Sequence, residues 1–235
     1  MTPMEKEHLI ESIKILNSNW ILLFLLAFVK TLIVYDKLSL FGILGLLILL
    51  FMIPALYGRL QEHVLGGKRS SLYETFRLNA FHYYAVMFTL LVPIHIITNV
   101  LGLTNMMRQN MNDILTFVSA FLLLIVDILL IYILPLVFIN KDGLSSIPTG
   151  LRLLSNNLMK SIPLLLLCFV KAFIKWLPGV FIINKLQSDK IFSTAYNFAF
   201  NILSLYVGFL IFLLASIYLV KEKKHWQGNE TIGYK

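Results

Sequence analysis

The chain alternates between long apolar runs and short polar connections. The clearest run is 114–139, ILTFVSAFLLLIVDILLIYILPLVFI, in which Asp127 is the only charged residue. A helix of this length would measure roughly 39 Å, enough to cross the ~30 Å hydrocarbon core of a bilayer. Because the apolar residues follow one another without alternation, the run predicts a transmembrane helix and not a strand of a β-barrel.

Six runs of this kind predict six transmembrane helices in one domain, 19–220. The expected fold class is therefore an all-α, polytopic membrane protein. Its polar connections are short, and glycine or serine residues in them are typical of helix ends. The six predicted spans are about 20–35, 38–57, 81–103, 114–139, 161–183 and 195–220.

The two ends of the chain differ from the spans. Residues 221–235 predict a polar tail. Residues 1–18 mix acidic and basic residues with apolar ones at helical spacing, which predicts an amphipathic helix in the membrane interface that leads into the first span. Its apolar face would hold Leu9, Ile10, Ile13 and Leu16.

Composition and charge agree with a membrane protein. Hydrophobic residues make up 58% of the chain and charged residues 14%, whereas about a quarter of an average soluble domain is charged. The net charge is +8, and we attribute it to the positive-inside bias and not to a nucleic-acid partner. The termini and every second loop hold thirteen Lys and Arg, against four in the remaining loops. This asymmetry predicts a cell-membrane protein with both termini in the cytoplasm.

Two segments of the sequence form an internal repeat. SSLYETFRL (70–78) aligns without gaps with SSIPTGLRL (145–153), and each precedes a predicted span. Each serine pair is expected to cap a helix, and Ser71 with Glu74 has the spacing of a capping box. A match over nine residues can also arise by coincidence, so the repeat is a hypothesis.

The repeated segments predict two elbow helices, which are short amphipathic helices in the cytoplasmic interface that bend into a span. Arg77 and Arg152 hold equivalent positions in them. At that depth an arginine can contact lipid phosphate while the apolar face meets the acyl chains. The expected partners are therefore the lipid bilayer and its anionic headgroups.

Two Ser-x-x-x-x-x-Arg elbows, after spans two and four of a six-span chain, resemble the membrane domain attached to some bacterial glycerophosphodiester phosphodiesterases and the stand-alone relatives of that domain. The resemblance covers roughly 40–220. It implies a fold and a bacterial membrane location. The soluble phosphodiesterase domain is not in the sequence, so the resemblance does not imply that activity.

Charged residues inside the spans are the main candidates for a functional site. Asp127 and Lys171 both lie near the middle of consecutive, antiparallel spans, which places them at similar depth. Lys175 lies one turn further along the same face of its span. Pairing is the usual way in which buried charges are tolerated. Asp127 could exchange a proton or bind a cation under the influence of Lys171, or form a structural ion pair, or stay protonated and bond a neighbouring helix.

No catalytic, metal-binding or nucleotide-binding motif is present, so we expect no enzyme activity, cofactor or metal. The favoured function is a transporter subunit or a non-enzymatic accessory component, with a separate ATPase as a possible partner. A structural protein that organises lipids is one alternative. A lipid-modifying enzyme is another, and its candidate residues are Glu62, His63, Glu74 and His82.

Overall fold

The computed structural model describes residues 3–35, 40–67, 70–105, 112–181 and 190–230. Over these residues the chain forms eight helices and no strand, which confirms the all-helical prediction. The helices are α1 (Pro3–Ser18), α2 (Trp20–Tyr35), α3 (Leu40–Leu65), α4 (Leu72–Asn105), α5 (Asn112–Asn140), α6 (Ser146–Asn156), α7 (Ile162–Phe181) and α8 (Lys190–Glu230).

Four helical segments are long and apolar enough to cross a membrane, as expected of a helical membrane protein. They are Leu40–Leu65, Leu72–Ile97, Ala120–Asn140 and Thr194–Lys221. A fifth candidate is the pair Lys6–Ser18 and Trp20–Ile33, whose axes differ by 68°. The described apolar part of α7, Ile162–Ile174, is shorter. The structure therefore shows four to five candidate spans where the sequence predicts six.

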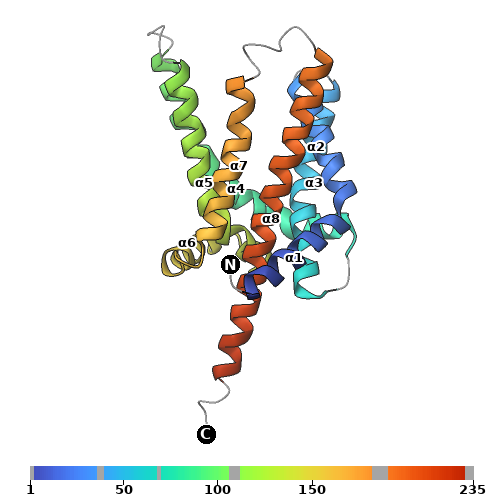
Figure 1. The fold of residues 1–235 in the computed structure, drawn as a ribbon, viewed down its shortest axis with the longest axis vertical. Helices are drawn as coiled ribbons and strands as arrows, with labels where there is room; N and C mark the ends of the chain where they lie inside the picture. Colours follow the sequence, from blue (N-terminus) through green and yellow to red (C-terminus); the bar gives the residue numbers. More distant parts are fainter. Residues whose placement is uncertain (1–2, 36–39, 68–69, 106–111, 182–189, 231–235) are drawn as a thin grey trace.

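The long helices form three hairpins: α2 with α3, α4 with α5, and α7 with α8 (Figure 1). One helix of each hairpin lies inside the bundle, because α3, α5 and α8 all contact one another. These inner helices contribute most of the largest fully buried side chains. The centre of the molecule is thus the place where α3, α5 and α8 meet.

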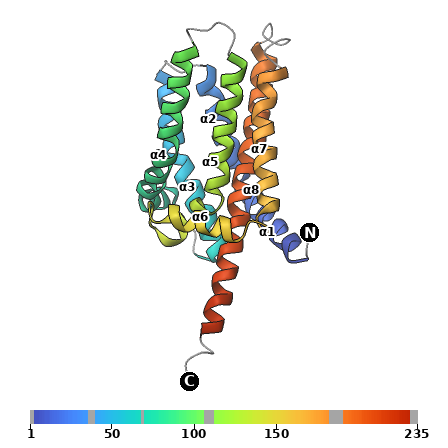
Figure 2. The same ribbon diagram turned by 90° about the vertical axis from the view of Figure 1, so that its left-hand side faces the viewer.

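Helices that run across the bundle gather at one end of it. α6 lies across this end beneath α5, and α1 lies against α8 (Figure 2). The first turns of α4 also run across the bundle before the helix turns to follow its long axis (Figures 1 and 2). The long helix α8 continues past this end, so residues 221–230 of the predicted polar tail are helical.

Two of these crossings depend on glycine. A Cβ added to Gly58 on α3 would collide with the side chain of Thr75 on α4. One added to Gly150 on α6 would lie 2.6 Å from Ile133 Cγ1 and 2.9 Å from Ile133 N on α5. The absence of a side chain therefore allows each crossing helix to approach an inner helix closely.

Helices α3 and α5 end in the same way. Gly66, the residue after α3, has a φ of 70°, and Lys141, the residue after α5, has a φ of 53°. A left-handed residue at this position is a common helix end. Gly66 thus confirms, at the end of α3, the expectation that glycine residues in the polar connections end helices.

The two serine pairs behave differently. The Ser71 hydroxyl accepts a hydrogen bond from the Glu74 N–H, and the Glu74 carboxylate accepts one from the Ser71 N–H, both at 3.2 Å. This confirms the predicted capping box. Ser145 makes no side-chain cap bond, so the corresponding prediction at α6 is wrong. The physical reason is that Ser145 already has helical angles (φ −67°, ψ −20°), whereas a capping residue needs an extended backbone.

Helix α1 packs on the bundle with Leu9, Ile13 and Leu16 of its predicted apolar face and with two polar residues beside them. His8, Ser12 and Leu16 are buried, while Ile10 is 57% exposed. These three buried residues are spaced four apart and so share one side of the helix. The side of α1 that packs on the bundle is therefore partly polar.

Candidate functional site

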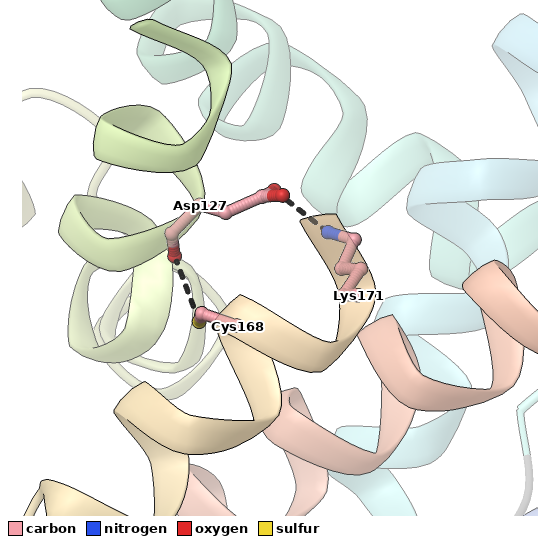
Figure 3. Close-up of polar contacts among 3 residues, drawn as sticks. All are labelled: Asp127, Cys168 and Lys171. Carbon is pink, nitrogen blue, oxygen red and sulfur yellow. Dashed lines mark hydrogen bonds and ion pairs between the residues drawn. The ribbon is translucent and has the colours of Figure 1, made fainter. Parts of the chain in front are cut away.

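Asp127 and Lys171 meet at the centre of the bundle. Asp127 lies on the inner helix α5, and its carboxylate points toward α7 (Figure 3). The Lys171 Nζ donates a hydrogen bond to Asp127 Oδ1 at 2.6 Å. The Lys171 side chain is 17% exposed and the Asp127 side chain is 15% exposed. This is a short, charge-assisted hydrogen bond between helices, and it is the contact that the equal depth of the two residues predicts.

A second contact fixes the register of α7 against α5. Cys168 and Lys171 are three residues apart, so they share one face of α7. The Cys168 thiol is fully buried, and its Sγ lies 3.8 Å from the backbone carbonyl oxygen of Asp127 (Figure 3). The sequence carries no signal that would place this cysteine beside Asp127.

Gly208 on α8 provides the space that Lys171 occupies. A Cβ at this position would lie 3.4 Å from Lys171 Cε and 3.5 Å from Lys171 Nζ. A larger side chain would therefore compete with the lysine for space. Sequence reasoning missed Gly208, although a glycine among large apolar residues is a signal of close approach.

A small cavity lies beside the ion pair. It holds about 30 Å³ of space for water, which is more than one water molecule requires. Its wall combines three polar residues, Asp127, Lys171 and Tyr57, with apolar residues from the inner helices. The complete lining is Tyr57, Asp127, Leu130, Ile131, Leu134, Lys171, Gly208, Ile211 and Phe212.

Tyr57 is the third polar residue of the cavity, and sequence reasoning missed it as well. Its ring packs against Phe209 and Phe212 of α8, with centroid distances of 4.6 and 4.7 Å. It also stacks on Phe138 of α5 at 5.9 Å. These contacts hold the tyrosine where the three inner helices meet.

Asp127 and Lys171 can each exchange their mutual hydrogen bond for another partner without a large movement of the helices. The carboxylate can accept a proton or bind a cation, and the ammonium group can then donate to water in the cavity. Among the residues that the structure describes, no group of three or more His, Cys, Asp or Glu could hold a metal ion. The chemistry of the site is therefore that of one carboxylate, one amine and one phenol.

The remaining predicted residues lie elsewhere. Arg77 and Arg152 are exposed on α4 and α6, respectively. Lys175 belongs to α7, but its side chain lies outside the described part of the structure. The structure thus joins Asp127 to Lys171 and does not extend the site to the two arginines.

The two carboxylates considered for a lipid-modifying enzyme bond the backbone between α3 and α4. Glu62 Oε2 accepts a hydrogen bond from the Ser70 N–H at 3.0 Å, while Glu74 accepts one from Ser71. Both contacts stabilise the connection between the two helices.

Comparisons of the chain with protein-family models, curated proteins and solved structures gave no match. The resemblance to the membrane domain of glycerophosphodiester phosphodiesterases therefore depends on the sequence motifs alone.

Proposed function

We propose that this chain is a non-enzymatic component of a cell membrane, a transporter subunit or an accessory protein, in which Asp127 and Lys171 form a site that responds to protons or cations. The observation that carries the proposal is the cavity beside the pair. A purely structural ion pair is most stable when hydrogen-bonding groups surround it completely. Here Asp127 and Lys171 both line a cavity with space for water, and water there offers either charge an alternative partner.

The proposed architecture has six spans, two elbow helices and both termini in the cytoplasm. Two features support a structural repeat with the 75-residue offset of the serine segments. The first is a close helix contact that occurs twice. Gly58 on α3 packs on Thr75 on α4, and Ile133 on α5 packs on Gly150 on α6. The second pair of partners, Ile133 and Gly150, lies 75 residues further along. The left-handed ends of α3 and α5 are separated by the same number of residues.

The repeat offers an internal comparison for the ion pair. At the same offset, Met52 on α3 corresponds to Asp127, and Ile96 on α4 corresponds to Lys171. Met52 is buried, with 6% of its surface exposed. Ile96, by contrast, is 57% exposed. The first of the two proposed repeats, which contains α3 and α4, thus has apolar residues at both positions. A charged pair that occurs in only one of the two proposed repeats supports a functional role for these charges.

The elbow helices are the proposed contacts with lipid and with a partner. Arg77 lies in the second turn of α4 and Arg152 lies on α6, and both side chains are exposed, as a contact with anionic headgroups requires. In a transporter, either elbow helix could couple to a separate ATPase. We also propose that the chain is related to the phosphodiesterase-associated membrane domains and is bacterial.

A carbodiimide experiment on the full-length protein in lipid vesicles tests the site without a known substrate. Dicyclohexylcarbodiimide enters apolar regions and modifies carboxyl groups in their protonated form. If Asp127 exchanges protons, its peptide is modified more at acidic than at neutral pH, as read by mass spectrometry. In Lys171→Met the same peptide is modified at neutral pH as well, because the carboxylate has lost its cation.

Two results would contradict the proposal. In the first, Asp127 stays unmodified at every pH in the wild type but is modified in Lys171→Met, which identifies a sealed structural pair. In the second, the double variant Asp127→Met with Lys171→Ile, which copies the first repeat, fails to accumulate in the membrane. That failure would show that the fold depends on the charges.

A further inference from the structure

The cavity beside Asp127 and Lys171 has a polar interior. Three of its nine lining residues are polar, yet polar atoms form the larger part of its wall. Its free space of about 30 Å³ holds only a few water molecules, since one water requires about 10–15 Å³. The polar groups therefore face a space that admits water and is too small for a metal ion with a full shell of water.

The oxygen atoms of this wall do not suit a metal cation. Only the Asp127 carboxylate and the Tyr57 hydroxyl offer side-chain oxygens to the cavity, whereas Mg²⁺ takes about six ligands and Ca²⁺ about six to eight. The Lys171 ammonium lies 2.6 Å from Asp127 Oδ1 and would repel a second cation there. A proton needs a single lone pair of the carboxylate, so this donor set favours a proton over a metal ion.

Tyr57 has a counterpart in the proposed repeat. The residue 75 positions further along is Tyr132 on α5, whose hydroxyl shares a 2.9 Å hydrogen bond with the Ser161 hydroxyl. The residue 75 positions before Ser161 is Val86, which is fully buried and cannot form this bond. The first of the proposed repeats thus lacks the serine that bonds the tyrosine of the second, and its own tyrosine lines the cavity.

The Tyr57 hydroxyl can serve both protonation states of the ion pair. A hydroxyl has one donor and two acceptor lone pairs. While Asp127 is ionised, the hydroxyl can donate a hydrogen bond toward the carboxylate through cavity water. Once Asp127 is protonated, it can accept one from the Lys171 ammonium through the same water. A phenylalanine at this position would keep the ring contacts and lose both hydrogen bonds.

The other titratable groups around Asp127 lie outside the cavity wall. The Cys168 thiol on α7 faces the backbone carbonyl of Asp127, and Tyr83 on α4 packs on the Tyr57 ring at 5.9 Å. Helix α8 lines the cavity with one glycine and two apolar side chains, and no described residue of α4 or α6 lines it. Within the described part of the chain, Tyr57 and Lys171 are therefore the polar groups that share the cavity with the carboxylate.

We propose that the site at Asp127 and Lys171 takes up protons and not metal cations, and that Tyr57 positions the cavity water through which the proton passes. The inference rests on the proposed function of the pair. In the step, cavity water that has received a proton from the aqueous phase transfers it to the Asp127 carboxylate. The Lys171 ammonium keeps its own protons and bonds water, so the pair gains one positive charge.

Carbodiimide modification of the full-length protein tests the choice of ligand. Modification of Asp127 is measured against pH in lipid vesicles with the same buffer on both sides, in a sodium or calcium salt and in a choline salt of equal ionic strength. We expect the same pH profile in all three, because no metal ion competes with the proton. Protection of Asp127 by sodium or calcium would overturn the inference and leave the proposed function intact.

The variant Tyr57→Phe tests the positioning role. The pH of half-maximal modification of Asp127 should rise by about one unit, because the carboxylate loses a hydrogen bond that favours its ionised form. Tyr132→Phe is the matched control: it removes the bond to Ser161 and should lower the Tm without moving this pH. An unchanged midpoint in Tyr57→Phe, or equal shifts in both variants, would overturn the role of Tyr57. An Asp127 that stays unmodified at every pH would contradict the proposed function itself.

Discussion

Removing one partner of the Asp127–Lys171 pair should destabilise the protein far more than removing both. In Lys171→Met, the Asp127 carboxylate loses the ammonium group 2.6 Å away. Breaking a buried ion pair in this way costs about 3–5 kcal/mol. Because both side chains keep some exposure and adjoin a cavity, water partly replaces the lost partner. We therefore expect the lower end of the range, about 3 kcal/mol.

The assay is a thermal double-mutant cycle on purified protein in detergent. For a chain of this size, each kcal/mol lowers Tm by about 2–4 °C, so Lys171→Met should melt about 6–12 °C below the wild type. Asp127→Asn should behave similarly, since it leaves the ammonium unpaired. The double variant has no unpaired charge and should fall within about 1 kcal/mol of the wild type.

A surface pair supplies the control cycle. Glu11 and Lys221 lie 3.6 Å apart and are both 49% exposed, so their coupling energy should be below about 1 kcal/mol. Additive effects at Asp127 and Lys171, with no more coupling than this control, would refute the reasoning. They would show that the two charges are already solvated independently.

Three further predictions concern the packing and the helix ends. Gly150→Ala should lower the free energy of unfolding by about 1–3 kcal/mol, because the added Cβ would meet the backbone of α5. Gly67→Ala is the control and should be nearly neutral, because its Cβ would make only a 3.6 Å contact. Equal shifts of Tm in the two variants would contradict this prediction. Ser71→Ala should cost about 1 kcal/mol through loss of the capping box, while Ser145→Ala, which removes no cap bond, should not change the Tm. Gly208→Ala should be tolerated, because its Cβ would make ordinary contacts. Gly208→Val should displace Lys171 and increase carbodiimide modification of Asp127. Unchanged modification in the valine variant would show that Gly208 does not provide the space for Lys171.

Local signals in the sequence were sufficient for much of the fold. The apolar runs predict the helices, since only helices satisfy their own backbone within a membrane. Gly66 and the pair of Ser71 with Glu74 mark helix ends through short-range backbone chemistry, and the structure confirms both. Ser145 shows the limit of such signals, because its backbone is already helical in the fold.

The sequence by itself determined the depth of Asp127 and Lys171, because helix rise and chain direction fix depth. It could not determine how each helix is rotated about its axis. A span that is apolar on every side has no polar face to indicate which residues point inward. Only the tertiary structure therefore decided that Gly208 and Tyr57 join the ion pair. The same holds for α1, whose buried side contains Ser12 while Ile10 remains exposed.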